Sequence, residues 1–137
     1  MEHYCSLQIS QLLVKLGFKQ KTRSVYTWGT ACKNGKWYQT WIHVETDFYA
    51  SAEYDEFPRP THAEAIEWLR KYKKVLIGIQ VCDVSQIPYT YEAIAEWIDT
   101  YDHRCITIAG KDHFGYKTPF KATEAALKFV LYNLLKN

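Results

Sequence analysis

The chain has 137 residues, of which 47% are hydrophobic and 23% charged, so it fits one globular domain over residues 1–137 and is not disordered throughout. Its formal charge of +2 is too small to indicate nucleic acid or an anionic membrane as the partner of the whole chain. Aromatic residues make up 16% of the chain, and they serve either as core or as an exposed binding platform.

The first expected element is a helix over residues 6–16. Ser6 is a suitable N-cap, and an apolar stripe follows helical spacing at Ile9, Leu12, Leu13 and Leu16. Gly17 then offers the left-handed position that ends many helices, and Phe18 can pack back on the last turn.

The clearest pattern is a β-hairpin formed by residues 24–31 and 37–50. Both segments are rich in β-branched and aromatic residues, and Asn34-Gly35 between them suits a two-residue type I′ turn. This turn places Trp28 opposite Trp41 and collects on one face Tyr26, Trp28, Trp41, His43, Glu45 and Asp47. The opposite face is more aliphatic and carries Val25, Thr27, Ile42, Val44, Thr46 and Phe48.

The second half of the chain alternates between helix and strand patterns. Residues 51–60 are expected to form a loop, and 61–73 a helix that begins with the Thr61–Glu64 capping box. An apolar strand follows at 75–81. Residues 88–101 fit both a helix and a strand; we prefer the strand because the preceding one needs a partner. Residues 106–108 continue the sheet, and the last helix covers roughly 121–136.

Together these elements predict an α+β fold. An antiparallel sheet of four to five strands would pack against two or three amphipathic helices, in the approximate order α-ββα-ββα. The similar patterns around Trp68 and Phe129 leave open whether a hairpin-then-helix unit is duplicated or two amphipathic helices are simply alike.

Three pieces of the chain resemble a known group of proteins. They read Y-x-S-L…L-G-F from Tyr4 to Phe18, P-T-x-x-E-A-x-x-W-L-R from Pro60 to Arg70, and an alanine- and leucine-rich helix that opens at Thr123. The group consists of short proteins of gut bacteria and their phages and mobile elements, and no activity is established for it. The resemblance implies a β-hairpin after the middle helix and does not include the hairpin of residues 24–50.

The cysteines and the chain start indicate a cytoplasmic location. No two cysteines form a C-x-x-C pair, and the first residues lack the basic and apolar regions of a signal peptide. No apolar stretch is long enough to span a membrane, so no membrane partner is expected. The thiols are therefore expected to stay reduced.

Two polar groups are candidates for chemistry. His43, Glu45 and Asp47 share a strand face, where a histidine beside carboxylates can act in acid–base catalysis or bind a metal ion. A second cluster matches no known metal-site spacing and comprises Asp102, His103, Cys105, Asp112 and His113. Solvated polar surfaces explain both groups better, so neither a cofactor nor a metal ion is expected.

The leading hypothesis is a small binding or interaction protein, an accessory factor of a phage or mobile element. Its partner would be another protein or a second copy, held by the aromatic face of Tyr26, Trp28, Trp41 and His43. One alternative is a hydrolase-like or metal-dependent enzyme that uses a His/carboxylate cluster. The other is a nucleic-acid-binding module that uses the basic residues within 15–23 and 70–74.

Overall fold

The computed structural model describes residues 3–51, 55–83, 85, 87–98, 104–110 and 114–136. In this part of the chain, three helices and two three-stranded antiparallel sheets are formed. The elements in chain order are α1 (Leu7–Lys15), β1 (Ser24–Lys33), β2 (Lys36–Glu45), β3 (Phe57–Pro58), α2 (His62–Lys73), β4 (Val75–Val81), β5 (Tyr91–Trp97), β6 (Cys105–Ile108) and α3 (Pro119–Lys136).

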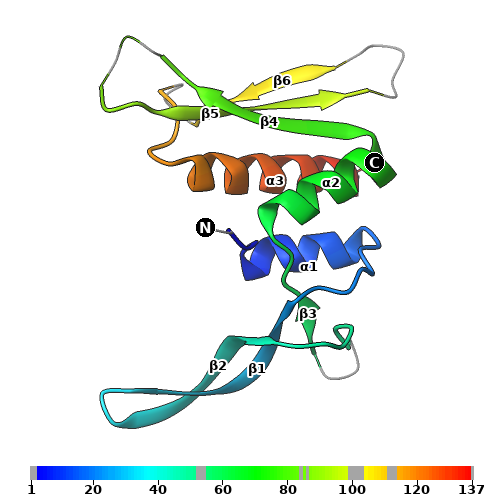
Figure 1. Ribbon diagram of the computed structural model, residues 1–137, viewed down its shortest axis with the longest axis vertical. Coiled ribbons are helices and arrows are strands. Elements are labelled where there is room, and N and C mark those ends of the chain that lie inside the picture. Colours follow the sequence, from blue (N-terminus) through cyan, green and yellow to red (C-terminus); the bar gives the residue numbers. More distant parts are fainter. Residues whose placement is uncertain are drawn as a thin grey trace.

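The elements are stacked in layers. The sheet of β4, β5 and β6 lies at one end of the molecule, with α2 and α3 beneath it and α1 below them (Figure 1). The sheet of β2, β1 and β3 lies at the other end, where the long β1–β2 ribbon projects away from the helices. The α+β class is confirmed, but the single sheet of four to five strands is wrong, because the helices separate the strands into two sheets.

The short strand β3 corrects the prediction that residues 51–60 form only a loop. Phe57 pairs with Tyr26 and Pro58 with Val25, so β3 is the edge strand beside β1. Proline is tolerated at such an edge because its missing N–H faces away from the ladder. In the β2-β1-β3 sheet the first strand along the chain is central, whereas in the β4-β5-β6 sheet the second strand along the chain is central. The two halves of the chain therefore do not repeat one topology.

The helix ends follow the local sequence signals. The Ser6 hydroxyl accepts a hydrogen bond from the Ile9 N–H, and Gly17 adopts a φ of +100° after α1. At α2, the Thr61 side chain accepts from the Glu64 N–H while the Glu64 carboxylate accepts from the Thr61 N–H. These caps satisfy donors that have no partner within the helix, which is why the predicted starts agree with the structure.

The ambiguous segment 88–101 contains β5, as preferred from the sequence. It pairs antiparallel with β4 on one side and with β6 on the other. Alternate residues Ala93, Ala95 and Trp97 are buried, which is the period of a strand with one face on a core.

One hydrophobic cluster joins the helices to the β4–β5–β6 sheet. Its fully buried members include Leu13 of α1, Leu69 of α2, Leu127 and Leu131 of α3, and Val75 of β4. Burying each such side chain contributes about 1.5–3 kcal/mol, so this cluster holds the three helices against one another and against the sheet. Among the described residues, none of the helices combines the length and apolar character needed to cross a membrane.

Candidate functional site

The β1–β2 ribbon has the register expected from its turn. Trp28 is paired with Trp41, Tyr26 with His43, and Val25 with Val44. Asn34 and Gly35 both have positive φ angles, of 53° and 76°, as a type I′ turn requires.

The aromatic face of the ribbon is partly open to solvent. The Trp28 and Trp41 ring centroids lie 5.6 Å apart in an edge-to-face arrangement, and the Trp28 side chain remains 52% exposed. The Phe57 ring of β3 also contacts Trp41, with the ring centroids 5.6 Å apart. The sequence did not indicate Phe57, because β3 is too short to show a strand pattern.

Tyr26 has a structural role in addition to its place on this face. Its hydroxyl donates a hydrogen bond to the Cys5 carbonyl, and the Arg59 guanidinium lies over its ring at 5.6 Å. Burial raises the pKa of Tyr26, and Arg59 opposes this effect. Tyr26 therefore fastens the base of the ribbon to the segment before α1. His43 lies directly opposite Tyr26, and Trp28 and Trp41 lie farther along the strands.

The two polar clusters considered from the sequence are not assembled in the described part of the chain. Glu45 and Asp47 line a surface hollow of about 370 Å³ together with Arg23, whereas His43 is exposed and does not line it. In the second cluster, Cys105 is exposed on β6. The other members, Asp102, His103, Asp112 and His113, lie outside the described residues.

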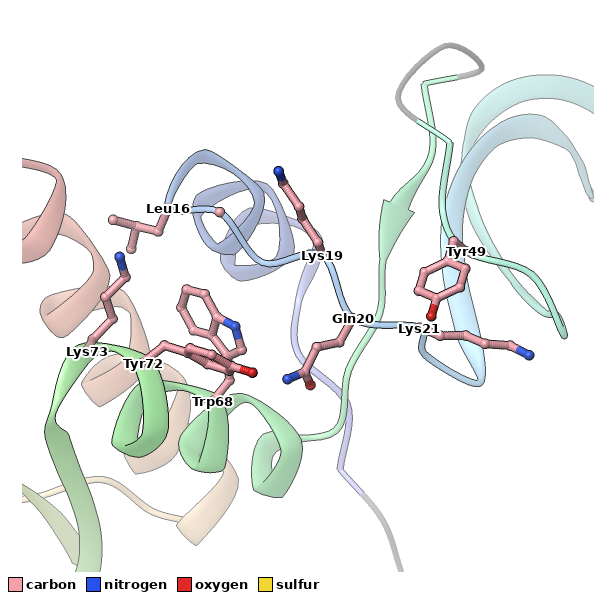
Figure 2. A pocket seen from close by; sticks show the side chains of 9 residues that line it. Leu16, Lys19, Gln20, Lys21, Tyr49, Trp68, Tyr72 and Lys73 are labelled. Atoms are coloured by element: carbon pink, nitrogen blue, oxygen red, sulfur yellow. The ribbon is translucent and has the colours of Figure 1, made fainter.

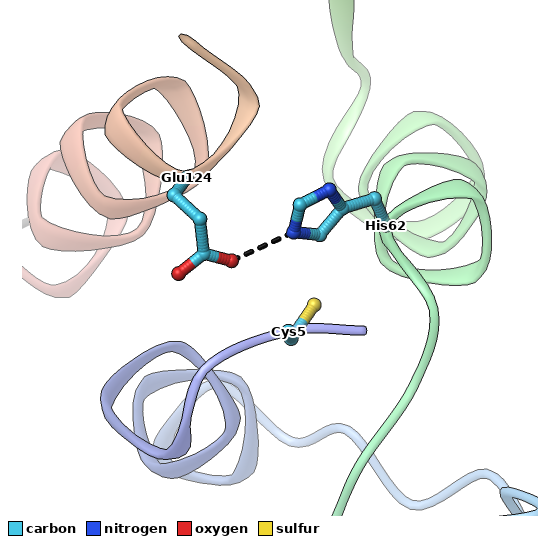
Figure 3. Close-up of side chains that lie close together, drawn as sticks. All are labelled: Cys5, His62 and Glu124. Atoms are coloured by element: carbon cyan, nitrogen blue, oxygen red, sulfur yellow. Dashed lines mark hydrogen bonds and ion pairs between the residues drawn. The ribbon is translucent and has the colours of Figure 1, made fainter. Parts of the chain in front are cut away.

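A different cluster is formed by Cys5, His62 and Glu124, and it is largely buried. The Nε2 atom of His62 lies 2.7 Å from Oε2 of Glu124, and the candidate ligand atoms of all three residues lie within 4.8 Å of one another. Figure 3 shows the Cys5 sulfur directed toward the imidazole and the carboxylate, which come from different helices. Cys5 has no exposed surface.

The starts of the three helices bring this cluster together. Cys5 immediately precedes the N-cap of α1, His62 is the first residue of α2, and Glu124 lies in the second turn of α3. An antiparallel contact joins the first two segments, because the Cys5 N–H donates to the Pro60 carbonyl at 2.9 Å and the His62 N–H to the His3 carbonyl at 2.8 Å.

The charges in the cluster are balanced by hydrogen bonds. Burial favours the neutral form of Glu124, but hydrogen bonds from His62 and from the Ser6 N–H outweigh it and lower the pKa of Glu124. Burial is the main cause that raises the pKa of the Cys5 thiol far above its usual range, and the nearby Glu124 carboxylate is the second cause. As it stands, the cluster holds a carboxylate that is ionised at neutral pH beside a neutral thiol.

This arrangement does not suit a nucleophilic cysteine. The Cys5 thiol donates to the Thr61 carbonyl at 3.9 Å, and His62 directs Nε2 to Glu124. A cysteine nucleophile needs a base on its sulfur and access for a substrate, and the buried Cys5 lacks both.

None of Cys5, His62 and Glu124 is among the site residues expected from the sequence. Cys5 and His62 lie next to the N-caps Ser6 and Thr61, and Glu124 lies in the second turn of α3. These positions near helix starts do not say that the three helices bring the side chains together.

A second candidate site is a groove that combines lysines with aromatic rings. It has a volume of about 600 Å³ and is lined by Leu16, Gly17, Lys19, Gln20, Lys21, Tyr49, Trp68, Tyr72 and Lys73. Figure 2 shows Tyr72 and Trp68 on α2, facing the segment of Lys19–Lys21, with Tyr49 on a separate strand connection. No Asp or Glu is among these lining residues.

The aromatic residues of the groove play different parts. Trp68 forms its floor, since it is buried and packs edge-on against Phe18 at 5.4 Å. Tyr72 and Tyr49 are 53% and 65% exposed, and the Lys71 ammonium lies 5.3 Å from the centroid of the Tyr72 ring. The Lys73 ammonium lies 5.7 Å from the Trp68 ring, at the edge of the groove.

The charge distribution of the chain is uneven. Eight of the 17 Lys and Arg residues lie in segments 15–23 and 70–74, which hold no Asp or Glu. The rest of the sequence holds nine Lys and Arg residues and all 15 Asp and Glu residues. The small net charge therefore conceals a strongly basic region and an acidic remainder. Both basic segments, which are far apart in the sequence, contribute lysines to the one groove.

No protein-family model, curated protein or solved structure matches the chain.

Proposed function

We propose that the protein binds single-stranded nucleic acid in the groove between the α1–β1 connection and α2. The observation that carries this proposal is the convergence of two lysine-bearing segments and two exposed tyrosine rings on one groove whose lining holds no carboxylate. Lysines neutralise phosphates, and exposed aromatic rings stack on bases whatever their sequence.

The groove favours a single strand over a duplex. In a duplex the bases are already stacked and paired, so the rings of Tyr49 and Tyr72 would find no base face to contact. Trp68 and Tyr72 lie between Lys73 and the Lys19–Lys21 segment, and Tyr49 lies beside Lys21 (Figure 2), so lysines and rings are interspersed along the groove as a single strand with splayed bases requires. Arg70 is less available to a phosphate, because its guanidinium is paired with the Glu67 carboxylate.

Fluorescence anisotropy with a labelled oligothymidine tests the proposal. We expect binding at low salt that weakens as salt rises, with a slope of log K against log salt of about −0.7 for each phosphate contact. Lys19→Ala and Lys73→Ala should each reduce that slope by about 0.7. Tyr72→Ala should weaken binding by about 1–3 kcal/mol, the usual value of one stacked base.

The ribbon tip supplies the matched control. Lys33 and Lys36 are also a pair of exposed lysines, but they flank the turn far from the groove. The Lys33→Ala/Lys36→Ala double variant should bind like the wild type. The proposal is wrong if no oligothymidine binds at low salt, or if the tip variant and the groove variants weaken binding equally.

A second binding function is favoured by the ribbon. We propose that two copies associate through β2, which pairs only with β1 and leaves its outer edge without a strand partner among the described residues. Trp37 of β2 is 73% exposed and Trp28 of the neighbouring strand β1 is 52% exposed. An exposed, apolar, unpaired edge strand is a surface that favours strand addition. Light scattering over a range of protein concentrations tests it, because the mass should rise toward that of a dimer.

A further inference from the structure

We propose that Cys5, His62 and Glu124 form a binding site for a zinc ion. This site is separate from the groove, and it rests on the convergence of a thiol, an imidazole and a carboxylate whose candidate ligand atoms all lie within 4.8 Å of one another. The three donors come from three helix starts that the hydrophobic cluster and the backbone contacts already hold in place.

The spacing of the donors is close to that of a zinc site. Zinc–ligand bonds of about 2.0–2.3 Å place neighbouring tetrahedral ligand atoms roughly 3.3–3.8 Å apart. The distance from His62 Nε2 to Glu124 Oε2 is 2.7 Å, so these two groups must separate slightly, and the Cys5 sulfur must approach them.

The types of ligand atom in this cluster favour zinc over magnesium and calcium. Magnesium and calcium prefer oxygen ligands only, whereas a thiolate beside an imidazole is typical of zinc. When the ion binds, the Cys5 thiol releases its proton to solvent and the His62 proton moves from Nε2 to Nδ1, so that Nε2 can face the metal.

Burial is compatible with such an ion because the charges cancel. The thiolate and the carboxylate each bring one negative charge, and the ion brings two positive charges, so the occupied site is neutral. By contrast, a thiolate beside Glu124 without the ion would bring two negative charges together, against which Arg59 is, among the described residues, the only cation whose charge opposes the raised pKa of Cys5. An imidazole for the fourth position is available in His3, whose ring centroid lies 6.1 Å from that of His62.

Cobalt provides a spectroscopic test, because it occupies zinc sites and a thiolate bound to it produces a charge-transfer band in the near ultraviolet. The protein would first be treated with EDTA and dialysed. We expect one equivalent of Co²⁺ to produce this band, one equivalent of Zn²⁺ to abolish it by displacement, and Zn²⁺ to raise the unfolding temperature.

The assignment to Cys5 does not depend on a variant that removes this core residue. A triple variant, Cys32→Ser/Cys82→Ser/Cys105→Ser, leaves Cys5 as the only thiol, since the chain has four cysteines. The band must persist in this protein and must weaken in Glu124→Gln, with zinc affinity lowered by about tenfold or more. The zinc affinity of His3→Ala shows whether His3 is the fourth ligand.

Two outcomes would overturn the proposal. One is the absence of a thiolate–cobalt band in the triple variant while circular dichroism shows that it is folded. The other is metal binding that Glu124→Gln and His62→Gln leave unchanged. Neither outcome bears on the groove, because oligothymidine binding is measured in the presence of EDTA and does not require the ion.

Discussion

At the scale of single residues, the cysteines occupy three kinds of environment. Cys32 and Cys105 are exposed and Cys5 is buried. Cys82 lies between these extremes, with its sulfur 3.6 Å from the Glu92 carboxylate. Partial burial and then the Glu92 charge raise the pKa of the Cys82 thiol, so less of the reactive thiolate is present at neutral pH.

We therefore predict a fixed order of alkylation by iodoacetamide at neutral pH. Cys32 and Cys105 should react first and Cys82 more slowly, while Cys5 should react only after unfolding. Glu92→Gln should accelerate labelling at Cys82, because it removes a negative charge beside the sulfur. Mass spectrometry of peptides measures each site separately, and Cys32 in the same sample is the control. An unchanged Cys82 rate in Glu92→Gln would show that the carboxylate has no such effect.

At the scale of elements, the His62–Glu124 pair connects the start of α2 to α3. For the EDTA-treated protein, we predict that Glu124→Gln lowers the free energy of unfolding by about 1–3 kcal/mol at pH 7, the usual loss for a buried charged hydrogen bond. The pKa of Glu124 is lowered in the folded state, so its contribution is complete above the ordinary glutamate range and is lost as pH falls through the folded value.

Urea unfolding across an acidic pH series measures this effect. The difference between the wild type and Glu124→Gln should shrink as pH falls below about 4.3, the ordinary pKa of glutamate. Glu67→Gln serves as the control because its carboxylate is exposed and forms an i,i+3 pair with Arg70, so a smaller change is expected at every pH. A difference that grows in acid would contradict the assigned role of Glu124.

Elements whose signals are local could be predicted from the sequence. Ser6, Thr61 and Asn34-Gly35 determine helix starts and a turn through bonds within a few residues, and the structure places them as expected. The two-residue strand β3 could not be predicted, since its only cause is the edge that β1 offers to Phe57 and Pro58. The separation of the strands into two sheets follows from that pairing and from the packing of three helices between them.

The two candidate sites also differ in how much of each could be recognised from the sequence. The basic segments 15–23 and 70–74 are visible in the sequence, but only the fold shows that they border one groove with Tyr49. The Cys5–His62–Glu124 cluster leaves almost no sequence signal, because its members are about sixty residues apart and each is a common residue near a helix start.

At the scale of the whole molecule, the projecting ribbon determines how two copies would meet. Lys33 and Lys36 flank a two-residue turn, and in such a hairpin their backbones form a hydrogen-bonded pair. Because hydrogen-bonded and non-hydrogen-bonded pairs alternate, the even-numbered residues of β2 form backbone hydrogen bonds with β1. The odd-numbered residues of β2 direct their backbone N–H and C=O groups outward. Antiparallel pairing about a twofold axis at Trp41 places the Trp41 rings of both copies on one continuous face.

This alternation predicts opposite effects for proline at two adjacent positions. Gln39→Pro removes an outward N–H and should abolish association while the ribbon stays folded. Thr40→Pro removes an N–H that bonds to β1 and should disrupt the ribbon itself. Light scattering reports association, and circular dichroism with tryptophan fluorescence reports the ribbon. If Gln39→Pro associates like the wild type, the edge of β2 is not the interface.

The meeting of Cys5, His62 and Glu124 also has a kinetic consequence. Two long segments of chain must close before the three side chains touch, and closing long loops delays the contacts at their ends. By contrast, the β1–β2 turn and the caps of α1 and α2 form within a few residues and close early. Protection of the Cys5 thiol during refolding is therefore expected to follow the formation of the turn and the caps.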